Sequence, residues 1–152
     1  MSGGLQGLEY FRGSWGGSET GKAGTGSDSR TYAQLLGRFV ECRNRSEFAP
    51  QEANPNGEVH EDLVIYSYDE GAATIVARAF HTEGFVITYH LAKGSEDDLV
   101  FASTEVENGP PGLGARLTLH IEGPDAFEEV FELGPADGPF EEYLRNHWTR
   151  RS

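Results

Sequence analysis

The sequence predicts an all-β protein: a single antiparallel up-and-down β-barrel of about 8–10 strands with a short N-terminal helix. Runs rich in β-branched and aromatic residues recur roughly every 10 to 13 residues. Turn signals rich in glycine and proline separate these runs. The connections are short, which favours antiparallel neighbours, and closure of the sheet removes the exposed edges that so many consecutive strands would leave. A β-sandwich is the alternative, but it would need longer crossing connections.

The elements follow from local patterns. Leu8 and Phe11 share one face of a short helix expected over residues 5–11. Apolar and polar residues alternate along 116–122, as they do in a strand with one buried face. Two stretches rich in glycine or proline, 16–29 and 44–57, are expected to be long loops, the first of them mobile. The strands are expected, in order, at 13–20, 30–42, 63–68, 73–80, 85–91, 99–106, 116–122, 127–133 and 140–149.

Composition narrows the class of protein. The 152 residues fit one domain, 1–152, and carry 25 acidic against 12 basic side chains, a net charge of −13. Nucleic acid and anionic membrane surfaces are therefore not expected as partners, because binding to them depends on Lys and Arg. The single cysteine excludes an internal disulfide, and no apolar run or signal-peptide pattern appears, so we expect a cytoplasmic protein. Strand edges near the two long loops could support a homodimer.

A set of short motifs resembles a known superfamily. A short helix is followed by Gly13-x-Trp15-x-Gly17, Leu36-Gly37-Arg38-Phe39 and Tyr66-Ser67-Tyr68-Asp69 come later, and Arg150 lies at the C-terminus. This pattern resembles the lipocalin and fatty-acid-binding (calycin) superfamily. Within it, the chain is similar to bacterial lipocalin-like barrels without a settled function, and more distantly to nitrobindin-like haem-binding barrels. The resemblance implies a barrel with an internal cavity. It also implies that Trp15 closes one end against an arginine near the last strand, for which Arg145, Arg150 and Arg151 are available.

The hairpin around Glu83 and Gly84 is the predicted ligand-binding surface. With a two-residue turn there, one face collects a mostly bulky, apolar set that should point inward: Val76, Arg78, Phe80, Phe85, Ile87 and Tyr89. An interior arginine needs a partner, so Arg78 and Tyr89 are predicted to bind an anionic head group, while Phe80, Phe85 and Ile87 line the cavity. Two alternatives remain: Arg78 pairs with an interior glutamate, or it points to solvent after a register slip of one residue.

These residues predict non-catalytic binding of a small, partly apolar ligand with an anionic group for Arg78 to hold. The first alternative is haem, bound through His147 as the nitrobindin resemblance implies. The second is an isomerase- or cyclase-type enzyme, whose mark would be an interior carboxylate with a strongly raised pKa. The third is a packed barrel without a ligand. No catalytic residue, no other cofactor and no metal site is expected, since His60, His81, His90 and His120 lack metal-ligand spacing.

Overall fold

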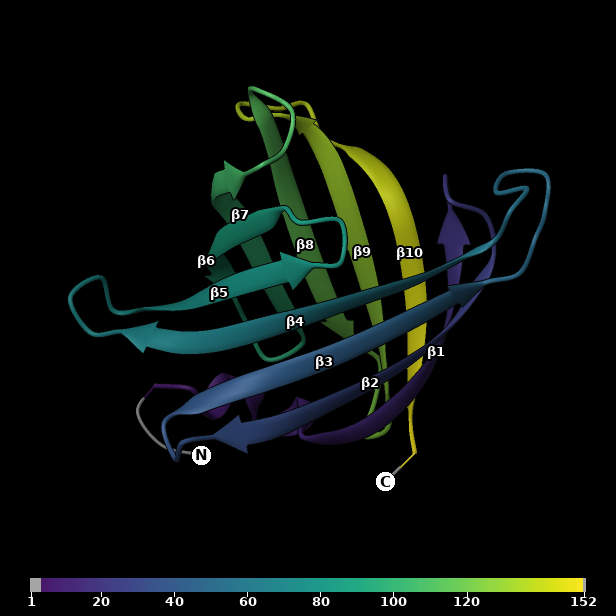
Figure 1. Ribbon diagram of the computed structural model, residues 1–152. Coiled ribbons are helices and arrows are strands. Elements are labelled where there is room, and N and C mark those ends of the chain that lie inside the picture. The colour runs from purple at the N-terminus through teal and green to yellow at the C-terminus, as the bar shows by residue number, and fades with distance from the viewer. Residues whose placement is uncertain (1–3, 152) are drawn as a thin grey trace.

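Ten antiparallel strands follow one another around a closed barrel, in which β1 pairs with β10 (Figure 1). The computed structural model describes residues 4–151, and one short 3-10 helix, η1 (Gln6–Phe11), precedes the barrel. The all-β barrel prediction is confirmed. No helix within residues 4–151 is long and apolar enough to cross a membrane. The strands are β1 (Gly13–Gly21), β2 (Gly26–Leu35), β3 (Phe39–Phe48), β4 (Glu58–Asp69), β5 (Thr74–His81), β6 (Val86–Gly94), β7 (Asp98–Glu107), β8 (Leu113–Ile121), β9 (Ala126–Pro135) and β10 (Glu141–Arg150).

Two expected boundaries are wrong. The run 30–42 is divided between β2 and β3 by a tight turn, in which Leu36 and Gly37 both have positive φ, as a type I′ hairpin requires. The stretch 16–29 is not a mobile loop, because most of it belongs to β1 and β2. Its glycines allow close packing: a Cβ on Gly17 would come within 2.8 Å of the Trp148 ring. The glycines in this stretch therefore indicate close packing inside the barrel rather than flexibility.

Helix η1 closes one end of the barrel, the lower end in Figure 1. Leu8 and Phe11 are fully buried in the core, and the Trp15 indole N–H donates to the Phe11 carbonyl oxygen at 2.6 Å. The rings of Phe11 and Trp15 both meet Phe127 edge-on, at 5.0 and 4.7 Å between centroids. Aromatic packing of this kind fills the barrel at the η1 end.

Arg150 holds helix η1 against the end of the barrel. Its guanidinium lies 4.3 Å from the Trp15 ring centroid and donates to the carbonyl oxygens of Tyr10 and Arg12 at 2.7 and 2.8 Å. A cation over an indole face is attracted by the ring quadrupole, and here it also satisfies carbonyls at the end of η1. Of the three arginines expected to meet Trp15, Arg150 is the one that does.

Candidate functional site

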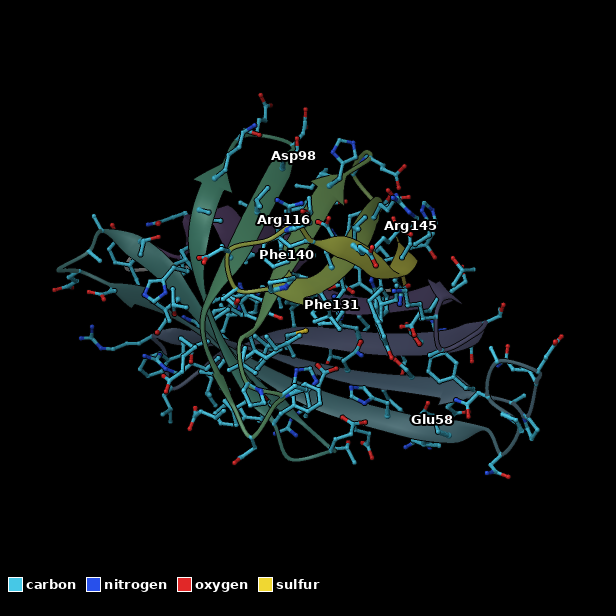
Figure 2. All side chains as sticks on the ribbon, turned by 90° about the horizontal axis from the view of Figure 1, so that it is seen from above. Glu58, Asp98, Arg116, Phe131, Phe140 and Arg145 are labelled. Atoms are coloured by element: carbon cyan, nitrogen blue, oxygen red, sulfur yellow. The ribbon has the colours of Figure 1, made fainter. Side chains whose placement is uncertain are left out.

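The candidate site is the interior of the barrel at the end opposite η1, which we call the unplugged end. Five connections lie there: residues 22–25, 49–57, 82–85, 108–112 and 136–140. Inward apolar side chains of β6, β8 and β9 make an apolar wall here, apart from Glu129 of β9, whereas the other buried polar side chains, on β1–β3 and β10, make a polar wall. In Figure 2, which is seen from above, Phe131 of the apolar wall lies near the middle of the view, and Arg116 lies beside Phe140 of the 136–140 connection.

Arg30 is the interior arginine, and it is fully paired. Its guanidinium donates to both carboxylate oxygens of Glu129 at 2.9 Å, and its Nε donates to Asn44 Oδ1 at 3.0 Å. It also lies 4.2 Å from the Trp148 ring centroid. Burial would lower the pKa of Arg30, but the Glu129 charge raises it well above the ordinary value. This bidentate pair leaves Arg30 no free fork for an anionic ligand.

A carboxyl pair lies closer to the unplugged end. Glu19 and Asp28 are 5% and 4% exposed, and Asn146 donates to Asp28 Oδ2 and, at 3.4 Å, to Glu19 Oε1. Burial and the neighbouring Asp28 raise the pKa of Glu19 to about 9, and burial also raises the pKa of Asp28. At neutral pH Glu19 therefore carries a proton. Over residues 4–151, Asp28 Oδ1 and Asn146 Oδ1 are buried without a hydrogen-bond partner.

Two histidines continue the polar wall. His60 lies 3.3 Å from Asp62 through Nε2 and 2.7 Å from Glu83 through Nδ1, and its hydrogen bond to Asp62 is the main reason that its pKa rises to about 9. Burial lowers the pKa of His81. Asn44 donates to Asp62 Oδ2 at 3.3 Å, so this group is joined to Arg30 and Glu129. One hydrogen-bond network thus spans strands far apart in the sequence.

The hairpin register predicted for the ligand-binding surface is wrong by one residue. Arg78 pairs with Thr88 and Phe80 with Val86, because the turn has three residues, with Gly84 at φ 99°. A shift of one residue moves every side chain to the other face. Arg78 therefore points outward, where it donates to Ser67, and the exposed Phe80 lines an open outer trough of about 590 Å³.

The other predicted lining residues lie where a ligand inside the barrel could meet them. Tyr89 and Ile87 are buried and point inward, and burial raises the pKa of Tyr89. Phe85 is partly buried and stacks on His81, with centroids 4.3 Å apart. Arg78 and Tyr89 are not together, so they cannot form the predicted head-group site.

His147 does not fit an interior haem ligand. It lies on β10 between Asn146 and Trp148, which both point inward, and its own side chain is 50% exposed. Its Nδ1 lies 3.0 Å from Glu122 Oε1 on the outer face. An axial ligand must reach the iron from within the barrel, so this histidine cannot serve there.

Sequence reasoning missed the polar wall, although one signal pointed to it. Once Trp15 is placed inside, the two-residue period of a strand places Glu19 inside as well. The pairing of Trp15 with Arg30 in β2 extends the same rule to Asp28 and Tyr32. The meeting of His60 with His81 had no sequence signal, because it depends on the register between β4 and β5.

Comparisons with known proteins agree with this fold. No protein-family model matches the sequence, and no curated protein sequence does either. The structure is similar to the crystal structure of Rv2717c from M. tuberculosis, with a TM-score of 0.70 and 13% identity over 100% of this chain and 99% of that one. It is also similar to a de novo designed fluorescence-activating β-barrel, with a TM-score of 0.50 and 12% identity over 95% and 96%. The shared property is the closed barrel.

Proposed function

We propose that the protein binds a small molecule, without catalysis, inside the barrel at its unplugged end. The observation that carries this proposal is the division of the inner surface into an apolar and a polar wall, with buried acceptors on the polar wall that no described side chain satisfies. These polar atoms are covered by protein, so a ligand donor would reach them only if the surrounding side chains moved. The designed barrel of similar fold is fluorescence-activating, which supports the interior as a place for a small molecule.

The polar part of the ligand is neutral or cationic in this proposal. Arg30 is neutralised by Glu129, and Arg78 lies outside, so neither is left for a carboxylate inside the barrel. Asp28 and Asp62 instead face the interior with oxygen acceptors. An anionic head would be repelled there, whereas an amine or a hydroxyl can donate. The apolar body would pack on Phe85, Ile87 and their neighbours.

A pair of fluorescent probes tests this proposal. A dansyl-labelled alkylamine and the matched dansyl-labelled fatty acid have the same apolar body and opposite charge. We expect the amine to bind with a rise in fluorescence and the acid to bind at least about 10-fold more weakly. Equal or stronger binding of the acid would contradict the assigned polarity, and binding of neither probe would contradict the proposal itself.

Two adjacent positions on β5 locate the bound probe. Ala79 is buried and points inward, so Ala79→Leu fills interior space and should weaken binding about 10-fold or more. Arg78 is exposed on the outer face, so Arg78→Leu is the matched control and should leave affinity unchanged. The reverse result would place the probe on the outer trough.

A second candidate function is acid–base catalysis by the pair Glu19 and Asp28. An interior carboxyl whose pKa rises to about 9 is the feature that distinguishes this alternative. Carbon-13 NMR titration of the Glu19 carboxyl tests it directly. A pKa below about 5 would remove the candidate, because such a group could not hold a proton at neutral pH.

We further propose that the barrel is related to the calycins. The contact between Arg150 and Trp15 supports this relation, since the resemblance implies an arginine over that indole. We also propose that the protein works in a reducing compartment such as the cytoplasm, because its one cysteine, Cys42, is buried and unpaired.

A further inference from the structure

Three side chains that could bind a metal ion meet at the unplugged end. His60 comes from β4, His81 from the end of β5 and Glu83 from the turn that follows. One ligand atom from each lies within 4.8 Å of the other two. His60 Nε2 and His81 Nδ1 are 3.4 Å apart, and Glu83 Oε2 is 2.7 Å from His60 Nδ1. His81 and Glu83 contact opposite nitrogens of the His60 ring, so an ion shared by the two histidines would lie at His60 Nε2, and the exposed Glu83 side chain would turn to reach it.

The separation of the two ring nitrogens suits a tetrahedral ion. With zinc–nitrogen bonds of about 2.0–2.1 Å, neighbouring ligand atoms in a tetrahedron lie about 3.3 Å apart. Two facing imidazole nitrogens at 3.4 Å match that edge. The rings are tilted by 42° with centroids 5.5 Å apart, so they do not stack on each other. The two ring nitrogens form a hydrogen-bond contact without the ion, and their spacing also fits two ligands of one ion.

A fourth group completes the surroundings. Asp62 Oδ2 lies 3.3 Å from His60 Nε2, and Asn44 holds that oxygen from the other side. Asp62 is paired across the strands with His81, so its carboxylate lies on the inward face with both histidines. Two imidazoles with carboxylates form the mixed nitrogen and oxygen set that suits zinc and related transition metals, whereas magnesium and calcium prefer oxygen alone.

Access and charge agree with a cation site. The side chains of His60 and Glu83 are 21% and 45% exposed, so an ion can reach them from solvent. The buried cation Arg30 is held by Glu129. A divalent ion would displace the proton that His60 shares with Asp62 and Glu83, and these two carboxylates would then balance the charge of the ion.

We propose that His60, His81 and Glu83, with Asp62 beside them, bind one divalent transition-metal ion, zinc by preference, at the unplugged end of the barrel. The metal site adjoins the proposed small-molecule site and shares Asp62 with it, but its three main ligands, His60, His81 and Glu83, can be tested with the metal alone. A loaded site would also fix the 82–85 connection at the rim of the interior.

Calorimetric titration of the untagged, chelator-treated protein with zinc tests this site. We expect one zinc per chain, with magnesium neither binding nor competing. His60→Gln, His81→Gln and Glu83→Gln should each weaken binding at least about 10-fold. His90→Gln is the matched control, because His90 lies on the outer face of β6 beside Thr104 and should not alter the affinity.

Two results would overturn the proposal: a wild-type protein that takes up no zinc, or variants at His60 and Glu83 that bind zinc as the wild type does. Glu83 is half exposed in a turn, so Glu83→Gln will fold, and circular dichroism verifies each variant. No organic probe is present in this titration. Failure of the zinc site is therefore distinguishable from failure of small-molecule binding.

Discussion

Replacing Glu19 by glutamine should flatten the dependence of stability on pH. The ordinary glutamate pKa of 4.5 rises to about 9 in the folded protein. The folded state therefore binds more protons than the unfolded chain between these values. The stabilisation from this group is complete below pH 4.5 and is lost as pH rises through about 9. A glutamine side chain stays neutral at every pH, so the variant lacks the loss of stability that comes from Glu19.

The size of the effect follows from linkage. One proton difference corresponds to about 1.4 kcal/mol per pH unit, so stability should fall by on the order of 4 kcal/mol between about pH 5 and 8 through this group. Urea unfolding of wild type and Glu19→Gln at several pH values measures it. We expect the free energy of unfolding of the variant, relative to that of the wild type, to increase steadily as pH rises. Parallel profiles would refute the reasoning, and Glu105→Gln on the exposed face of β7 is the control, expected to follow the wild type.

Three further predictions concern the interior and the plug. Arg30→Met should cost about 3–5 kcal/mol in urea unfolding because it strands the Glu129 charge, and the double change with Glu129→Leu should recover most of that loss; an equal or larger loss in the double variant would contradict the buried pair. Arg150→Ala should cost about 1–3 kcal/mol and lower the Tm, whereas Arg151→Ala, at an exposed position, should not. The Cys42 thiol, with a pKa of about 12 from burial, should react with a disulfide reagent only as fast as the protein unfolds; prompt reaction of the native protein would show that it is accessible.

The barrel could be predicted from the sequence because its signals are local. Strand periodicity, turn residues and the Gly13-x-Trp15 opening each act over a few positions, and together they indicated the class of fold, η1 and the role of Trp15. Arg150 was one of three expected partners, and the structure selects it. The class of fold and η1 depend on chain neighbours, whereas the choice of Arg150 depends on the register between β1 and β10.

The site could not be predicted because register decides it. The three-residue turn closed by Gly84 exchanged the faces of β5, so Ala77 and Ala79 lie inside while Arg78 and Phe80 lie outside. Bulk was a poor guide to the inward face, since the inward positions of β5 include the small residues Ala77 and Ala79.

Isoleucine methyl NMR during titration with the dansyl-labelled amine tests small-molecule binding inside the barrel most directly. The four isoleucines sample separate places: Ile87 in the unplugged half, Ile75 and Ile121 toward η1, and Ile65 on the outer face. Binding at the proposed site predicts that the Ile87 methyl signal shifts most, while the Ile65 methyl signal does not shift. A shift of Ile65 without one of Ile87 would put the ligand outside and contradict the proposal.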